Sequence, residues 1–247
     1  MRVHVLGSSG TYPAPGRPAA GFVVEHGATR VWCDAGPGTF VALPMDPEMI
    51  DAVVVSHQHA DHCSDLFTAF HAWTYRPNPR RGVPLYGPQE VWDRLSMFLD
   101  QFQGSNLEET FQFTPVWTGD TVALGSISVS FTEVNHSVPA IGSRWEANNR
   151  SLFYTGDTGP EGEWRELASG VNVLLAEASY QDSTRDPDYS MHMSATEAGS
   201  VARELGVDRL VLTHIPPYLD VSRSVYEAEQ TFDRPVTFAT PGTSFDI

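Results

Sequence analysis

Short runs of apolar and β-branched residues recur along the chain, and most of them are too short to form helices. Polar, glycine or proline residues separate these runs, as they separate the strands of a β-sheet. We therefore predict strands at Val3–Leu6, Phe22–Glu25, Arg30–Cys33, Ala52–Ser56, within Val83–Pro88, and at Thr121–Leu124, Ile127–Glu133, Ser151–Thr155, Val171–Ala176, Arg209–Thr213 and Val236–Ala239.

Longer segments with helical patterning lie between the strands. The segment Ala195–Leu205 has a distinct start signal, because Ser194 and Glu197 form a capping-box pattern. The predicted helices are Asp65–Tyr75, Glu90–Phe102, Ala195–Leu205 and Ser222–Phe232. Strands arrive in runs, and helices are interspersed more heavily in the second half. This order favours two sheets with helices outside them.

The composition fits one domain spanning residues 1–247, with 41% hydrophobic residues and no linker rich in proline, glycine or serine. The segment Arg76–Gly82 is interpreted as a surface loop. No apolar run is long enough to span a bilayer, and Met1–Leu6 is interpreted as a first strand, so we expect neither a membrane segment nor a signal peptide. Cys33 and Cys63 make no disulfide framework, and a reducing cytoplasm is the default location.

The formal net charge is −16, from 31 acidic and 15 basic side chains. Such a field repels nucleic-acid backbones unless a local basic patch overrides it. Bound divalent cations would offset part of this charge. We therefore expect a small substrate rather than a large polyanion.

The run His57–His62 places imidazole and carboxylate ligands directly after a predicted strand. These donors suit a borderline metal such as zinc. A loop there can direct His57 and His59 at one ion while Asp61 and His62 face a second. Paired ions can activate water and neutralise a departing oxyanion. The alternative, a histidine-rich surface loop, is disfavoured because the chain supplies further ligands.

Three more polar residues follow strand-like segments. They are His136, Asp157 and His214. Open sheets place ligands at strand ends, where a stiff scaffold meets a free loop. Each of these residues alone is more often structural. Together with His57–His62 they favour a metal centre.

These residues resemble the five-part signature of the metallo-β-lactamase superfamily. The matching segments are His57-x-His59-x-Asp61-His62, His136, Gly156-Asp157-Thr158 and His214, with Leu6–Thr11 and Asp34–Gly38 fitting that family's early strands. The resemblance implies an α+β fold, an αβ/βα sandwich of two mixed sheets flanked by helices, with two divalent metal ions at one edge. The implied ligands are His57, His59 and His136 for the first ion, Asp61, His62 and His214 for the second, and Asp157 as the bridge.

Further features narrow the resemblance to one branch. Asp157 stands where the zinc β-lactamases have a cysteine, and Cys63 is interpreted as a packed residue at a helix start. The segment Met191–Ala198 resembles the extra histidine motif of the ribonuclease Z and phosphodiesterase branch. That resemblance implies that His192 contacts the scissile phosphate and helps to protonate the leaving oxygen. Without it, His192 would equally suit a polar group at a helix entry.

Phosphodiester hydrolysis would assign further roles to these residues. Asp61 could act as general base as well as ligand, and His192 could donate a proton or a hydrogen bond. Asp34, between a strand and a glycine-rich turn, is a candidate acceptor for the N–H of a ligand imidazole, and Glu177 is a further candidate.

The interval between His136 and Asp157 is only 21 residues. Ribonuclease Z enzymes that process tRNA generally carry a long arm there, and this chain has no room for one. The short, armless members resemble cyclic-nucleotide phosphodiesterases, and the segment Leu212–Tyr218 resembles that of actinobacterial members in particular. We therefore expect a small phosphodiester, with 3′,5′-cyclic nucleotides as first candidates. Aromatic residues that could stack a base are Tyr12, Trp73, Trp145 and Tyr218.

Several alternatives remain open at this point. The same metals would serve a thioester or lactone hydrolase of the glyoxalase II kind, or a tRNA 3′-processing endonuclease that lacks its own arm. A non-enzymatic metal-binding protein is disfavoured by the intact ligand set. Zn²⁺ is the default metal, while Mn²⁺ and Fe²⁺ suit similar sites. The sequence leaves the oligomeric state open, although a homodimer is the commonest symmetric assembly.

Overall fold

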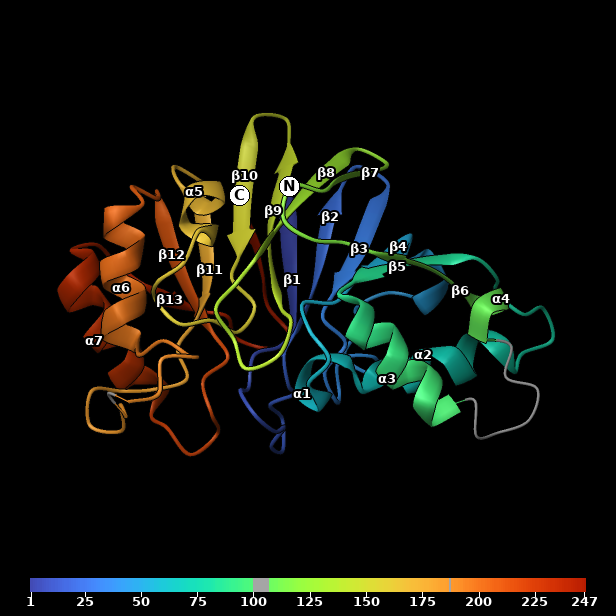
Figure 1. Cartoon of the computed structure of the whole chain (residues 1–247), viewed down its shortest axis with the longest axis horizontal. Helices are drawn as coiled ribbons and strands as arrows, with labels where there is room; N and C mark the ends of the chain where they lie inside the picture. Colours follow the sequence, from blue (N-terminus) through green and yellow to red (C-terminus); the bar gives the residue numbers. More distant parts are fainter. Residues whose placement is uncertain (100–106, 187) are drawn as a thin grey trace.

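Two seven-stranded sheets face each other at the centre of the molecule (Figure 1). The computed structural model describes residues 1–99, 107–186 and 188–247. The first sheet, in spatial order, contains β14 (Ser244–Asp246), β1 (Arg2–Gly7), β2 (Gly21–His26), β3 (Thr29–Cys33), β4 (Ala52–Val54), β5 (Val83–Gly87) and β6 (Phe111–Pro115). The second contains β13 (Thr237–Phe238), β12 (Arg209–Thr213), β11 (Val173–Glu177), β10 (Arg150–Tyr154), β9 (Ile141–Ala147), β8 (Ile127–Glu133) and β7 (Thr121–Leu124).

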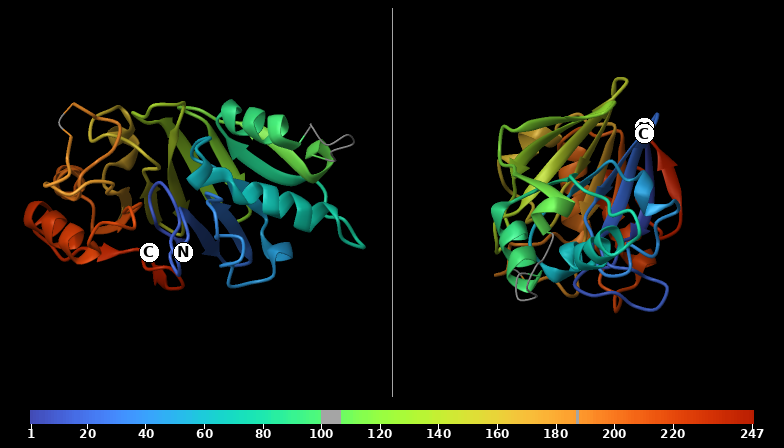
Figure 2. Two further views of the ribbon diagram at one scale, coloured as in Figure 1. Left: turned by 90° about the horizontal axis from the view of Figure 1, so that it is seen from below. Right: turned by 90° about the vertical axis from the view of Figure 1, so that its right-hand side faces the viewer.

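The two sheets share one pairing pattern. In the first, the strands from β14 to β3 pair antiparallel and those from β3 to β6 pair parallel. In the second, β7 to β10 pair antiparallel and β10 to β13 pair parallel. β14 returns to the first sheet and pairs with β1, so the two chain ends lie side by side (Figure 2).

Helices cover the outer face of each sheet. Beside the first sheet lie α1 (Ala60–Cys63), α2 (Asp65–Thr74), α3 (Gln89–Leu99) and α4 (Leu107–Thr110), and the short 3₁₀ helix η1 (Pro47–Met49) precedes β4. Beside the second lie α5 (Trp164–Ala168), α6 (Ala195–Glu204) and α7 (Val221–Phe232). An apolar cluster lies under each set of helices. None of the helices in the described ranges is long and apolar enough to cross a membrane.

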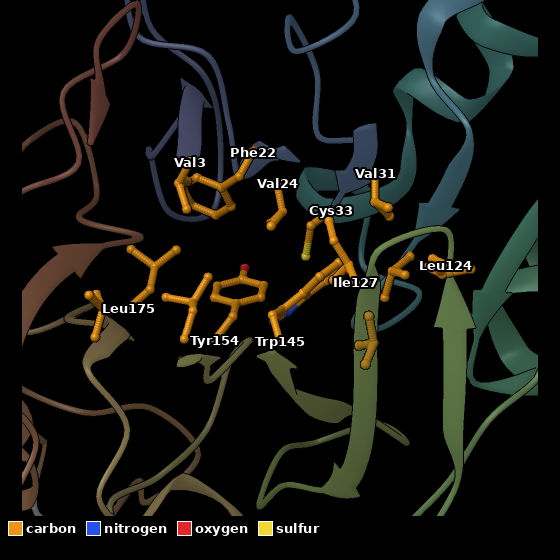
Figure 3. Packing of buried hydrophobic residues seen from close by; sticks show 14 of the residues in the cluster. Val3, Phe22, Val24, Val31, Cys33, Leu124, Ile127, Trp145, Tyr154 and Leu175 are labelled. Atoms are coloured by element: carbon orange, nitrogen blue, oxygen red, sulfur yellow. The ribbon is translucent and has the colours of Figure 1, made fainter. Parts of the chain in front are cut away.

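The central core fills the space between the sheets. Figure 3 shows Phe22, Val24 and Cys33 of the first sheet facing Trp145 and Tyr154 of the second. The rings of Phe22 and Tyr154 meet edge to face, with centroids 5.3 Å apart. Such a pair adds about 0.5–1.5 kcal/mol to the burial of its rings. The core therefore fixes one sheet against the other.

The expected sandwich of two mixed sheets flanked by helices is confirmed. The predicted capping box of α6 is present, since Ser194 accepts from the Glu197 N–H and the Glu197 carboxylate accepts from the Ser194 N–H. The predicted helix Glu90–Phe102 corresponds to α3, and its last residues lie outside the described ranges.

Several elements were absent from the sequence prediction: β6, β9, β14, α1, α4 and α5. β9 illustrates the reason, because Gly142, Arg144 and Glu146 interrupt its apolar residues. Trp145 on this strand is fully buried, whereas Glu146 is exposed. β8 has the same alternation and was predicted, but it contains three β-branched residues, whereas Ile141 is the one β-branched residue of β9.

Replacing Val129 by Ala should lower the free energy of unfolding by about 2 kcal/mol, because two carbons are removed at ~0.8 kcal/mol each and a cavity remains. Val129 lies in the central core and is 0% exposed. The matched control is Val41→Ala, at a side chain that is 84% exposed. Urea denaturation of both variants checks this. Equal losses of stability would contradict the assigned core.

Candidate metal centre

The predicted ligands converge where strands of both sheets end. His57 follows β4 of the first sheet, while His136, Asp157 and His214 follow β8, β10 and β12 of the second. His59 lies two residues beyond His57, just before α1. Because the strands are anchored in the apolar core, their ends hold these side chains on a stiff frame.

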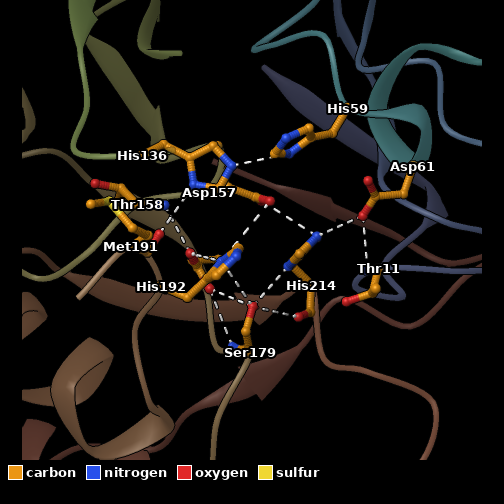
Figure 4. Close-up of polar contacts among 12 residues, drawn as sticks. Thr11, His59, Asp61, His136, Asp157, Thr158, Ser179, Met191, His192 and His214 are labelled. Atoms are coloured by element: carbon orange, nitrogen blue, oxygen red, sulfur yellow. Dashed lines mark hydrogen bonds and ion pairs between the residues drawn. The ribbon is translucent and has the colours of Figure 1, made fainter. Parts of the chain in front are cut away.

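The side chains form two groups whose potential ligand atoms lie within 4.8 Å of one another. The first group is His57, His59, His136 and Asp157, and the second is Asp61, His62, Asp157 and His214. All seven residues predicted as metal ligands are thus brought together, and Asp157 belongs to both groups. Figure 4 shows His59, Asp61, His136 and His214 arranged around Asp157.

The geometry of both groups fits divalent ions. His59 Nδ1 lies 3.0 Å from His57 Nε2 and 3.1 Å from His136 Nε2. In the second group, Nε2 of His62 and Nε2 of His214 are 3.1 Å apart. Tetrahedral zinc with Zn–N bonds of ~2.0 Å places its nitrogens about 3.3 Å apart. The donor set and its spacing therefore fit a metal in each group.

Asp157 connects the two groups. Its Oδ2 is 3.7 Å from His57 Nε2, and its Oδ1 is 3.2 Å from His62 Nε2. Oδ1 is buried and accepts no hydrogen bond from the described residues. Burial alone would raise the pKa of Asp157, but the surrounding imidazoles, His214 first, hold it well below its usual range. A buried carboxylate oxygen without a donor is what a bridging ligand requires.

A first carboxylate–serine pair orients the imidazoles attached to the first sheet. Asp34 is fully buried directly after β3. Its carboxylate accepts from Ser56 Oγ at 2.9 Å, from His62 Nδ1 at 2.8 Å and from the Tyr154 hydroxyl at 2.7 Å. Ser56 Oγ in turn lies 3.0 Å from His57 Nδ1. With Nδ1 held, His57 and His62 present Nε2 to the centre.

A second pair performs the same task on the second sheet. Glu177, fully buried at the end of β11, accepts from Ser179 Oγ at 2.6 Å and from His192 Nδ1 at 2.8 Å. Ser179 Oγ lies 2.9 Å from His214 Nδ1. Each pair thus fixes two rings, one through the carboxylate and one through the serine. Asp34 and Glu177 both lie where the sequence predicted acceptors for imidazole N–H groups.

His192 lies beside both ligand groups. Its ring stacks on that of His214, with centroids 5.8 Å apart and planes 11° apart, and its centroid is 5.0 Å from that of His136. Burial alone would lower the pKa of His192, but the Glu177 carboxylate raises it to about 9. With Nδ1 held by Glu177, Nε2 is left for a substrate.

Two glycine-containing segments pass close to the backbone of residues in the second ligand group. A Cβ on Gly36 would lie 2.0 Å from the Asp61 carbonyl oxygen, and one on Gly10 would lie 2.6 Å from the His214 carbonyl oxygen. Beyond Gly10, the Thr11 N–H donates to Asp61 Oδ2 at 2.8 Å. These two glycines therefore let the chain pass directly against ligand residues.

Sequence analysis missed the serines. Ser56 and Ser179 each lie two residues beyond the end of a parallel strand, β4 and β11, and each precedes or faces a ligand histidine. Isolated serines carry no motif, so only their position after a strand could have identified them. Cys63 belongs to neither ligand group, and its Sγ lies 3.3 Å from the Gln58 carbonyl oxygen.

Comparison with known proteins identifies the family. Residues 29–215 match the family model of the beta-lactamase superfamily domain. The chain belongs to the metallo-β-lactamase superfamily. Membership in this superfamily supports the assignment of the chain as a hydrolase. Its His/Asp cluster is suited to binding metal ions.

Relatives within the metallo-β-lactamase superfamily cover nearly the whole chain. An uncharacterized protein of Mycobacterium tuberculosis is 36% identical over 254 residues, covering 100% of this chain and 92% of the relative. The probable metallo-hydrolase YhfI of Bacillus subtilis is 25% identical, with 98% of each chain covered. Its crystal structure has a TM-score of 0.86 at 23% identity, with 99% of each chain covered. A ribonuclease Z of Methanopyrus kandleri is 28% identical, covering 92% of this chain and 91% of the relative.

Replacing Asp34 by Asn should destabilise the protein by about 1–3 kcal/mol, because an amide would turn donor hydrogens toward buried donors. Tyr154→Phe is the matched partner, since it removes one donor and leaves the carboxylate its other bonds. It should cost about 1 kcal/mol. Thermal unfolding of both variants measures the difference. An Asp34→Asn variant as stable as Tyr154→Phe would contradict the central place of Asp34.

Proposed function

We propose that this chain is a metal-dependent phosphodiesterase acting on small phosphodiesters, with 3′,5′-cyclic nucleotides as first candidates. The observation that carries the proposal is the position of His192 beside two ligand groups joined by Asp157. The whole chain would act as one hydrolase domain, because both sheets contribute ligands to the same centre.

The proposed ligands fall into two sets. The first ion would be held by His57, His59 and His136, the second by Asp61, His62 and His214, with Asp157 bridging them. When bound, the pair of ions would polarise the phosphate and lower the pKa of water toward about 7. We propose Zn²⁺ because nitrogen donors predominate, and Mn²⁺ and Fe²⁺ are the alternatives.

Asp61 and His192 would perform the proton transfers. Asp61 Oδ2 lies 3.1 Å from His214 Nε2 and is held by the Thr11 N–H, so the carboxylate can orient and deprotonate the attacking water. His192, held at Nδ1 by Glu177, would present Nε2 to the phosphate and donate a proton to the leaving oxygen. Asp34 and Glu177 would act as positioning residues for the imidazoles.

Two features support a small substrate. The residues between His136 and Asp157 form β9, β10 and short connections, so no arm projects from this interval. The net charge of −16 opposes association with a long polyanion. The M. kandleri relative is a ribonuclease Z, and a ribonuclease cleaves phosphodiester bonds. This relative therefore supports a phosphodiester as the substrate class. Thioesters, lactones and tRNA are the competing substrate classes, and a thioester represents them in the assay below.

Chelation should abolish hydrolysis of cyclic AMP and bis(p-nitrophenyl) phosphate, and Zn²⁺ should restore it.

Asp157→Asn should lower the metal content below two ions per chain and reduce kcat/KM by about 10²-fold or more, since bridging ligands hold the geometry. Asp93→Asn on the exposed face of α3 is the matched control. Elemental analysis and steady-state kinetics measure both. Thioester turnover with inert phosphodiesters would contradict the proposed reaction class.

His192→Gln should lower kcat by about 10²–10⁴-fold for substrates with alkoxide leaving groups, because a positioned acid contributes about that much. The loss should be smaller for bis(p-nitrophenyl) phosphate, whose leaving group needs no proton. Metal content should be unchanged. The matched control is His71→Gln, at an exposed helix residue. An equal loss with both leaving groups would assign His192 to phosphate binding instead of proton donation.

A further inference from the structure

A cavity of about 320 Å³ opens directly beside His192. Three tyrosines form much of its wall, and we name it the tyrosine pocket. It is lined by Thr11, Ser179, Tyr180, Asp186, Tyr189, His192, Pro216 and Tyr218. We propose that the tyrosine pocket binds the nucleobase of the substrate, an inference that rests on the proposed phosphodiesterase function. The volume lies at the lower end of the range for small-molecule sites, about 300–1,000 Å³.

The tyrosines are placed for stacking on a planar ring. Tyr189 lies with its ring centroid 6.0 Å from that of His192 and its plane tilted by 31°. Tyr189 and Tyr218 are 38% and 66% exposed, so part of each side chain can be reached by a ligand. Arg185 lies over the ring of Tyr180, with its guanidinium carbon 5.6 Å from the ring centroid. Stacking of a base on an aromatic side chain contributes about 1–3 kcal/mol.

The Asp186 carboxylate favours a base with hydrogen-bond donors in the tyrosine pocket. Among its described lining residues there is no lysine or arginine, Asp186 is the one acidic side chain, and His192 is the one side chain that can carry a positive charge. A second phosphate placed beside the Asp186 carboxylate would meet repulsion, which disfavours nucleoside diphosphates bound in that part of the pocket. A ring with N–H donors suits the Asp186 carboxylate. Among nucleobases, those with an exocyclic amino group offer such donors.

A second cavity adjoins the metal centre on the side of His59 and fits a base less well. Phe67 and Phe98 line it, but their rings pack on each other with centroids 4.4 Å apart. Its Arg94 guanidinium already donates to Gln58 Oε1. Because Phe67 and Phe98 pack on each other and Arg94 is already paired, this second cavity provides a control for the tyrosine pocket.

Tyr218→Ala and Tyr189→Ala in the zinc-loaded full chain should each raise KM for cyclic AMP by about 5- to 150-fold, the equivalent of the stacking energy. The abasic analogue, ribose 3′,5′-cyclic phosphate, retains the scissile ring and lacks the base. The preference of kcat/KM for cyclic AMP over this analogue should therefore collapse in both variants. Tyr226→Ala on α7, at a side chain 60% exposed, and Phe98→Ala should keep the preference of the unmodified protein.

Calorimetric titration with adenosine gives a readout independent of turnover. Adenosine should bind the unmodified protein and the Tyr226→Ala variant. In Tyr218→Ala its affinity should fall by about 5- to 150-fold, as expected for KM. Unchanged adenosine affinity and unchanged substrate preference in both pocket variants would overturn the proposed base site while leaving the phosphodiesterase intact. Tyr218-dependent adenosine binding without hydrolysis of any phosphodiester would support the pocket and refute the proposed function.

Discussion

The arrangement of the site depends on the hydrogen bonds that orient its imidazoles. An acceptor that holds one ring nitrogen of a histidine fixes the tautomer and the direction in which the other nitrogen faces a metal. Asp34 with Ser56 supplies this on the first sheet, and Glu177 with Ser179 supplies it on the second. Without these pairs, the Nε2 atoms would have no fixed direction and the two ligand groups could not share Asp157.

The fold places the two pairs symmetrically. Each sheet changes from antiparallel to parallel pairing, and Asp34 and Glu177 lie at the ends of β3 and β11, close to this change. The apolar core between the sheets then sets the distance between the pairs. Tyr154 connects the apolar core to the hydrogen bonds of the site, since its ring packs on Phe22 and its hydroxyl donates to Asp34. This one buried residue therefore contributes both to the packing between the sheets and to the position of Asp34.

Much of the fold and the ligand set could be predicted because the signals are local. The strand before His57 and the capping box of α6 are contiguous patterns, and the seven predicted ligands come together in the structure. β9 was missed because it alternates with polar residues like β8 but contains one β-branched residue where β8 has three. The role of a residue that depends on distant contacts has no local signal, as Ser56 and Ser179 illustrate.

The aromatic residues illustrate the same limit. Trp73 and Trp145 are fully buried in the core and cannot stack a base, whereas Tyr218 lines the tyrosine pocket. The sequence predicted only Tyr218 of the three tyrosines there, although Tyr189 stands three residues before His192 and Tyr180 also lies near its ring. Burial and neighbours, which distinguish a core ring from a binding ring, are properties of the tertiary structure.

The most direct test of the shared metal centre is the anomalous scattering of zinc in crystals of the zinc-loaded protein. Two peaks about 3.5–4 Å apart, one on each side of the Asp157 carboxylate, are the predicted result. His59 should ligate through Nδ1, and His57 and His62 through Nε2. A single peak, or a peak held by Glu177 and His192, would contradict the account.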